Sequence, residues 1–362
     1  MMNSHTDIYV LRLKNIRRSL RRKGIEGFLV TDMNNVRYLS GFSGSSGFLF
    51  ITGKQNLFVT DFRYKEQSEK EVGGWDIIIE RGNRIKILQN LSRNAGIDKL
   101  GFESSVTHEF FKKISAMGFN INAFNGLIEK LRETKDLAEI NSIRKAVERA
   151  KAAFLDVKPH IKEGTKEISI ALRLEESLRK KGCRNIPFEI IVASGANSAM
   201  PHARPTEKKL NKGDFVIIDW GGEADGYYSD MTRTFLIKGE RGLGKKRAIY
   251  RTVREANLKA ISCVALGMQS KKIDEAGRSY IRESGYGEFF GHGTGHGVGM
   301  QIHEAPRISW NTSGRVRENM VFTIEPGIYV PGLGGVRIED LVLVGKNRAE
   351  VLTSLKKDLE II

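Results

Sequence analysis

The segment FVIIDWGGEADGYYSDMTRT, residues 215–234, joins two apolar stretches through a turn that contains glycine. An aspartate ends the first stretch, at Asp219, and another precedes the second, at Asp230. Two strands joined by such a turn would bring the carboxylates close together, and they would repel each other unless a cation or a proton compensated them. Aspartates are also common at strand ends and in turns, so neither residue alone indicates a site.

The segment GHGTGHGVGMQIHE, residues 291–304, holds three of the seven histidines of the chain: His292, His296 and His303. Glycine flanks the first two on both sides, and glycine permits unusual backbone angles and close approach of the backbone to a ligand. Histidine is the commonest metal ligand in proteins. The segment therefore indicates a functional site rather than a histidine of the core.

Two further segments, VFTIEPGIY (321–329) and GVRIEDLV (335–342), each place a glutamate in an apolar stretch that reads as a strand. Carboxylates are rarely buried without a partner. An ion pair with Arg337 would explain either Glu325 or Glu339, but less readily both. Four carboxylates and one imidazole suit a pair of Mn²⁺, Co²⁺, Zn²⁺ or Fe²⁺ ions better than a structural zinc, and paired ions are typical of hydrolases such as aminopeptidases.

In order and spacing, these four segments resemble the metal motifs of the pita-bread metallopeptidases, and aminopeptidase P and Xaa-Pro dipeptidase (prolidase) are the most similar members. The stretches NVRYLSGFSG (35–44) and TDFRY (60–64) resemble the creatinase-like N-terminal domain of that family. The resemblance implies a mixed α+β fold with two domains. A smaller creatinase-like α/β domain would span residues 1–125, and a pita-bread catalytic domain would span residues 126–362.

The resemblance implies two divalent metal ions (Mn, Co or Zn) and a role for each matching ligand. Asp219 would bind one ion, and Asp230 and Glu339 would bridge the two. His296 and Glu325 would complete the shell of the other ion.

The same resemblance assigns the catalytic and substrate-binding residues. Glu325 would move a proton from the attacking water to the leaving nitrogen, and His303 would stabilise the tetrahedral intermediate. His292 and His202, the latter in SGANSAMPHAR (194–204), would surround the substrate. Arg337 would hold the metal carboxylates in place.

The reaction that this family implies is hydrolysis of the bond before proline in a proline-containing peptide. We expect release of the N-terminal residue from Xaa-Pro peptides, as in aminopeptidase P, with Xaa-Pro dipeptidase as the alternative. A dipeptidase needs a cation for the free carboxylate of proline, and Arg307 and Arg315 are candidates. The arginine that animal-type prolidases carry further along this loop is replaced by Asn311, which favours the aminopeptidase.

Other members of the fold fit the sequence less well. Methionine aminopeptidase shares the five ligands but lacks an N-terminal domain such as the one expected here. Creatinase has two domains but lacks the ligand set. A non-catalytic binding protein on the same fold remains an alternative, because the net charge of +16 is compatible with a nucleic acid partner.

Apolar residues at spacings of three and four predict one helix over residues 126–158. Apolar stretches predict strands over residues 320–330 and 336–344, and residues 34–44 read as a loop with helix-like pieces.

Composition agrees with two folded domains in a chain of 362 residues. No apolar run approaches the roughly 20 residues that cross a bilayer, and residues 1–9 lack the pattern of a secretory signal, so we expect a cytoplasmic protein without a membrane partner. The two cysteines, Cys183 and Cys263, lie in no metal or disulfide motif. Lys and Arg are spread over many segments without interleaved aromatics, which favours a solvated surface over nucleic acid binding. By resemblance we also expect a homodimer.

Overall fold

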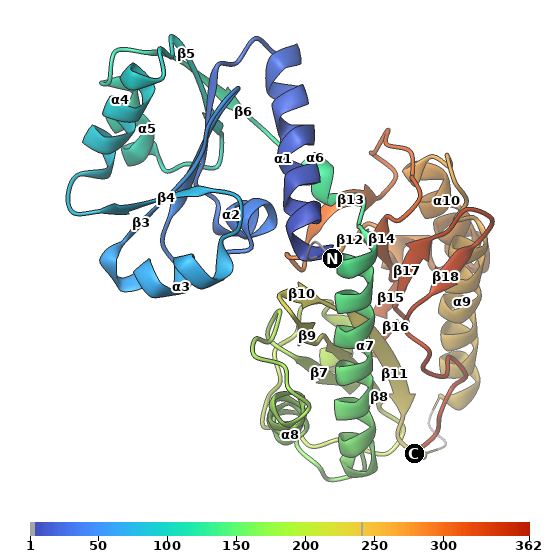
Figure 1. The fold of residues 1–362 in the computed structure, drawn as a ribbon. Coiled ribbons are helices and arrows are strands. Elements are labelled where there is room, and N and C mark those ends of the chain that lie inside the picture. The colour runs from blue at the N-terminus through green and yellow to red at the C-terminus, as the bar shows by residue number, and fades with distance from the viewer. Residues whose placement is uncertain (1–3, 240–241) are drawn as a thin grey trace. The chain divides into compact units, whose positions relative to one another are not determined.

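The computed structural model describes residues 4–239 and 242–362, which form two compact units (Figure 1). The first unit ends at Leu131 and the second begins at Arg132. The boundary expected from the sequence lies between residues 125 and 126, ahead of the short helix α6 (Glu129–Arg132). Residues 1–3, which belong to the segment searched for a secretory signal, lie outside the described residues.

The first unit is built on one mixed sheet with the strand order β4-β3-β2-β1-β5-β6. Its strands are β1 (Gly27–Val30), β2 (Phe48–Thr52), β3 (Asn56–Asp61), β4 (Asp76–Glu80), β5 (Lys99–Glu103) and β6 (Asn120–Phe124). Its helices are α1 (Ser4–Arg22), α2 (Met33–Ser40), the short η1 (Phe62–Tyr64), α3 (Lys65–Glu71), α4 (Arg84–Asn94) and α5 (His108–Ser115). Leu88 of α4 and Ile114 of α5 pack into one buried cluster with Phe50 and Phe102 of the sheet.

Helix α2 is more regular than the loop with helix-like pieces that the sequence predicts at residues 34–44. The Asp32 side chain accepts hydrogen bonds from the backbone N–H groups of Asn34 and Asn35, at 2.9 and 3.1 Å. Gly41 ends the helix in the left-handed region, with φ of 82°. An aspartate before the helix and a glycine after it are the usual signals for the two ends of a helix, and they explain the difference.

The second unit contains all the remaining elements. Its helices are α7 (Leu137–Val157), η2 (Lys158–His160), α8 (Glu167–Lys180), η3 (Gly195–Ala199), α9 (Leu243–Ser262), α10 (Ser270–Ile281), η4 (Arg282–Tyr286) and η5 (Gly287–Phe289). Its strands are β7 (Ile191–Ser194), β8 (Phe215–Trp220), β9 (Glu223–Ala224), β10 (Tyr227–Tyr228), β11 (Met231–Leu236), β12 (Gly295–Gly297), β13 (Glu304–Ile308), β14 (Val321–Ile324), β15 (Gly327–Val330), β16 (Gly334–Arg337), β17 (Asp340–Val344) and β18 (Ala349–Val351).

The strands of the second unit form a three-stranded sheet, β11-β8-β7, and a five-stranded sheet, β13-β12-β14-β17-β18, beside the hairpins β10-β9 and β15-β16. Figure 1 shows α7 and α8 on one flank of these strands and α9 and α10 on the other. An isolated bridge pairs Thr232 of β11 with Glu339, next to β17, and so links the two larger sheets. Buried side chains of α9, such as Ile249 and Val253, pack against Ile328 and Val336 of the second hairpin.

Two predictions of element length are wrong in this unit. The helix predicted over residues 126–158 is two helices, because Asp136 starts α7 with a capping box: Asp136 and Glu139 each accept the other's backbone N–H at 2.9 Å. The strands predicted over 320–330 and 336–344 are each divided, and the divisions fall at Glu325 and Glu339.

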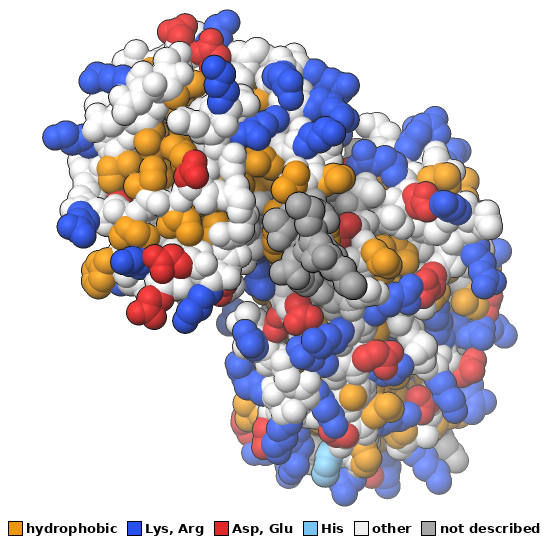
Figure 2. All heavy atoms as spheres, in the orientation of Figure 1, with side chains coloured by type: hydrophobic (Ala, Val, Ile, Leu, Met, Phe, Trp, Pro, Cys, Tyr) orange, Lys and Arg blue, Asp and Glu red, His pale blue; other side chains and the backbone are white. Residues whose placement is uncertain are grey.

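Surface charge is distributed over both units. Figure 2 shows Lys and Arg side chains interspersed with acidic and apolar ones on the visible face of each unit. Within the described ranges, no helix has the combination of length and apolar character that would let it cross a bilayer.

Candidate metal centre

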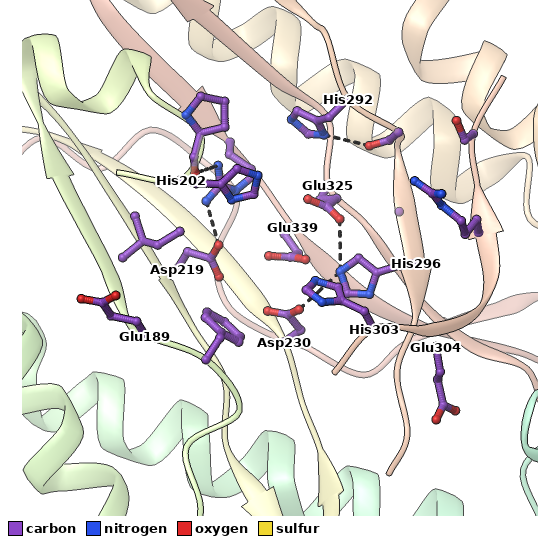
Figure 3. A pocket seen from close by; sticks show the side chains of 18 of the residues that line it. Glu189, His202, Asp219, Asp230, His292, His296, His303, Glu304, Glu325 and Glu339 are labelled. Carbon is purple, nitrogen blue, oxygen red and sulfur yellow. Dashed lines mark hydrogen bonds and ion pairs between the residues drawn. The ribbon is translucent and has the colours of Figure 1, made fainter. Parts of the chain in front are cut away.

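The five ligand candidates lie on different elements of the second unit and line one cavity of about 850 Å³. Asp219 belongs to β8, and Asp230 directly precedes β11. His296 is the central residue of β12, Glu325 follows β14, and Glu339 lies between β16 and β17. Strands β8 and β11 pair antiparallel, with Asp219 opposite Thr232, which brings the two aspartates to the same end of the sheet. In Figure 3 these side chains converge on a common space.

Three of the five lie closest together. Single ligand atoms of Asp230, His296 and Glu339 all lie within 4.8 Å of one another, so these residues form a possible site for a divalent ion. Nε2 of His296 is 3.6 Å from Oδ2 of Asp230 and 3.4 Å from Oε1 of Glu325. Nδ1 of His296 donates to the carbonyl oxygen of Gly297 at 3.2 Å, which leaves the lone pair of Nε2 directed at the carboxylates.

The electrostatics of the cluster favour a bound cation. Burial raises the pKa of Asp230, and the charges of Glu339 and Asp219 raise it further. Burial also raises the pKa of Glu339, with Glu325 and Asp219 adding to the effect. One oxygen each of Asp219 and Asp230, Oδ1 in both, is buried without a hydrogen-bond partner in the described part of the chain. Unpaired buried oxygens of this kind are costly, and oxygen donors with one imidazole fit a divalent transition metal.

Arg337 is the cation that the chain itself supplies to this cluster. Its Nη2 donates to Oδ2 of Asp219 at 2.7 Å, and its Nη1 donates to the Tyr329 hydroxyl at 2.9 Å and to the carbonyl oxygen of Pro201 at 3.2 Å. Arg337 therefore pairs with Asp219 and not with Glu325 or Glu339, the partners considered from the sequence. Thr232 completes the arrangement, because its hydroxyl donates to Oε2 of Glu339 at 2.6 Å.

The three further histidines also line the cavity. Nδ1 of His292 lies 2.8 Å from the carbonyl oxygen of Gly293 and therefore donates to it, so its Nε2 accepts from the Tyr329 hydroxyl at 2.9 Å. Burial lowers the pKa of His292, which keeps this ring neutral. The ring of His303 lies against that of His296, with 4.3 Å between centroids, and burial followed by the charge of His296 lowers its pKa. His202 reaches the cavity from the loop between β7 and β8.

The glycines beside His296 have a packing reason. A Cβ atom at Gly295 would lie 1.9 Å from the carbonyl oxygen of Thr323, and one at Gly297 would lie 2.2 Å from that of Ala305. Strand β12 lies between β13 and β14 and approaches both too closely for a side chain at either position. The glycine pattern seen in the sequence therefore fixes how deeply His296 sits between its neighbours.

The two candidate carboxylate-binding arginines lie in different places. Arg307 lines the cavity and is paired with His296 in the register of β12 and β13. Arg315 is not among the lining residues, and its Nη1 donates to the carbonyl oxygen of Gly267 at 2.9 Å. Its position near Arg307 in the sequence does not carry over to the fold, because residues 309–316 lead away toward α10.

Sequence reasoning missed several residues of the cavity wall. Nε of Arg204 lies 3.0 Å from Oε2 of Glu189 in an exposed ion pair, and both residues line the cavity with Phe188 and Ile191. Arg204 falls inside the loop quoted above for His202, which was the one available signal. No motif marks the other three, because their position depends on how β7 pairs with β8.

Comparison with known proteins agrees with this geometry. Residues 141–346 match the model of metallopeptidase family M24, and residues 12–134 match that of the creatinase/prolidase N-terminal domain. The chain is 36% identical to the Xaa-Pro dipeptidase of Pyrococcus horikoshii, over 98% of this chain and 99% of that one.

Solved structures extend the likeness to the whole fold. The Xaa-Pro dipeptidase from Bacillus anthracis superposes with a TM-score of 0.95 at 38% identity, covering 98% of this chain and 100% of that one. The X-Pro aminopeptidase from Thermotoga maritima gives 0.88 at 32% identity, covering 97% and 99%. Since the family model spans more than half of the chain and the relatives span nearly all of it, the chain belongs to metallopeptidase family M24.

Proposed function

We propose that this chain is a dinuclear-metal exopeptidase that hydrolyses the bond before proline at the N-terminus of peptides. The observation that carries the proposal is the cluster of buried Asp230 and Glu339 with half-buried His296, whose ligand atoms lie within 4.8 Å of one another in a cavity large enough for a short peptide. The relatives named Xaa-Pro dipeptidase and X-Pro aminopeptidase support the substrate class.

The same five residues would hold two divalent ions: Asp219, Asp230, His296, Glu325 and Glu339. Bound ions would polarise the scissile carbonyl and lower the pKa of water. The unpaired Oδ1 atoms of both aspartates support a share for Asp219 in this site, and its other oxygen is kept in place by Arg337.

Glu325 would carry the proton during the reaction. Its Oε1 accepts from the Thr323 hydroxyl at 3.2 Å and lies 3.4 Å from Nε2 of His296. Glu325 also lines the cavity, where it would take a proton from water and give it to the prolyl nitrogen. That nitrogen must be protonated as the C–N bond breaks, because a deprotonated amine is too basic to leave.

The remaining histidines would surround the substrate. His303 faces the cavity beside His296, where it would donate a hydrogen bond to the oxygen that gains charge during the reaction. His292 is neutral and held by Tyr329, so it would present a fixed ring to the prolyl side of the substrate. His202 would act from the opposite wall.

Arg307 favours dipeptides as the substrates. It lies on the strand next to His296 and lines the cavity, so its guanidinium would bind the free carboxylate of a C-terminal proline. Aminopeptidase P-like activity on longer peptides, expected from Asn311, remains the second candidate because the Thermotoga maritima structure bears that name.

The test uses metal-stripped protein reloaded with Mn²⁺, Co²⁺ or Zn²⁺ and offered Ala-Pro, Ala-Pro-amide and Ala-Pro-Ala. Metal-dependent cleavage of Ala-Pro that Glu339→Ala abolishes would support the proposed reaction. Preference for Ala-Pro over its amide, lost in Arg307→Gln but kept in the matched Arg315→Gln, would assign the dipeptidase. Equal cleavage of Ala-Pro-Ala would assign the aminopeptidase instead, and failure to cleave any of the three with metal bound would overturn the proposal.

A further inference from the structure

We infer that Glu167 is a positioning residue for the substrate-binding loop of residues 194–206. Glu167 is the first residue of α8 and is completely buried. It does not line the cavity, yet its carboxylate binds both ends of the loop that carries His202 and Arg204. Because His202 acquires its role from the function proposed above, the inference rests on that function.

The contacts of this carboxylate are unusually complete. Oε1 accepts from the backbone N–H and the hydroxyl of Ser194, both at 2.7 Å, at the start of the loop. Oε2 accepts from the hydroxyl and the backbone N–H of Thr206, at 2.6 and 3.1 Å, at its end. The amide of Asn197 donates to both oxygens, at 3.2 and 3.1 Å.

These groups are all donors, which is why an ionised carboxylate suits the place. A glutamine would exchange one acceptor oxygen for an NH₂ group that faces other donors. The position at the first turn of a helix also stabilises the negative charge. The backbone N–H groups of Glu167 and Ile168 donate to the carbonyl oxygens of Lys208 and Thr206, both at 3.0 Å, so the same helix end binds the loop a second time.

The middle of the loop is hydrogen-bonded to β16, which ends at Arg337 in the wall of the cavity. The Ser198 hydroxyl accepts from the backbone N–H of Gly335 at 2.8 Å, and the carbonyl oxygen of Pro201 accepts from Arg337 at 3.2 Å. Pro201 is the residue directly before His202. Glu167 therefore holds both ends of the loop and β16 holds its middle, which restrains the backbone that carries His202. In Figure 3 the His202 ring lies across the cavity from His303.

The chain contains a matched control in Glu139. It too is a buried glutamate in the first turn of a helix, α7, and it accepts from the backbone N–H of Asp136 at 2.9 Å and from the Tyr227 hydroxyl at 3.0 Å. These two bonds run to residues outside the loop 194–206. Glu139→Gln therefore makes the same chemical change at a buried carboxylate whose bonds to Asp136 and Tyr227 lie outside the loop.

The experiment is a double-mutant cycle on the metal-loaded enzyme with Ala-Pro. We expect Glu167→Gln to lower kcat/KM by up to about 100-fold, since a misplacement of the order of 1 Å has that effect. The loss should resemble that of His202→Ala, and adding Glu167→Gln to His202→Ala should cost less than about threefold more. Glu139→Gln should leave kcat/KM near that of the unmodified protein. Multiplicative losses in the cycle would overturn the inference.

A second measurement separates this inference from the proposed function. Amide hydrogen exchange over residues 194–206 should be faster in Glu167→Gln than in the unmodified protein and in Glu139→Gln, whether or not any peptide is cleaved. Unchanged exchange would overturn the inference even if the enzyme is an Xaa-Pro peptidase. If Glu167→Gln fails to fold, Thr206→Val is the second variant. It removes the 2.6 Å bond from the Thr206 hydroxyl to Glu167, together with the longer bonds that this hydroxyl accepts from the Lys208 N–H at 3.2 Å and the Asn197 amide at 3.4 Å, and it should shift both readouts in the same direction.

Discussion

Neutralising one carboxylate of the candidate metal centre should stabilise the metal-free protein. The perturbation is Glu339→Gln, which keeps the shape of the side chain and an oxygen that can accept from the Thr232 hydroxyl. Ligand atoms of Glu339 and Asp230 lie within 4.8 Å of each other, and two unit charges at that distance repel by about 3.5 kcal/mol at an effective dielectric constant of about 20. Because the pair relieves part of this repulsion by taking up a proton, we expect a gain of about 1–3 kcal/mol at pH 8.

The assay is thermal unfolding of metal-stripped protein, with and without added Mn²⁺. A gain of that size should raise Tm by about 2–4 °C per kcal/mol for a unit of this length. Added Mn²⁺ should raise the Tm of the unmodified protein and have much less effect on the variant. Glu304→Gln is a control for which the opposite change in Tm is expected. Glu304 forms ion pairs with Arg132 at 2.7 Å and Lys135 at 2.8 Å, so removing its negative charge should lower Tm. A lower Tm for metal-free Glu339→Gln would refute the electrostatic reasoning.

Three further outcomes follow from the same contacts. Burial raises the pKa of Asp230 and of Glu339 above that of the unfolded chain, so their contribution to stability is complete below about pH 4 and is lost as pH rises through the folded values. The Tm of metal-free protein should therefore fall as pH is raised above about 4, Mn²⁺ should flatten this profile, and a Tm that rises with pH would contradict the reasoning. Arg233→Met removes a positive charge that lies 2.8 Å from the completely buried carboxylate of Asp340. We expect urea titrations to show a free energy of unfolding lower by about 3–5 kcal/mol, and a loss below about 1 kcal/mol would contradict this. Arg307→Gln should raise KM for Ala-Pro and leave KM for Ala-Pro-amide unchanged in initial-rate measurements, and equal effects on both would exclude a carboxylate contact.

Much of the candidate site could be predicted from the sequence, because the metal ligands are histidines and carboxylates that lie close together in short motifs. Asp219 and Asp230 flank one hairpin, and the glycines around His296 mark the place where strands approach most closely. Such local patterns can be recognised without knowing the fold.

Other features were out of reach for a physical reason. Glu167 binds residues 27 to 39 positions away, and Glu304 binds Lys135 across 169 positions, so nothing local marks either pairing. The cavity wall at Glu189 depends in the same way on strand pairing. The broken helix at residues 126–158 is different, because the capping box of Asp136 and Glu139 is a local signal that periodicity alone obscured.

The ligand candidates come from two different sheets, and this affects the rate at which the protein unfolds. Asp219 and Asp230 come from the three-stranded sheet, whereas His296 belongs to the five-stranded one, so an ion can bind fully only after the two have docked. Interactions that form after the folding transition state slow unfolding and leave the folding rate unchanged. We therefore expect metal supply in the cell to set the lifetime of the finished protein against proteolysis, rather than the yield with which new chains fold.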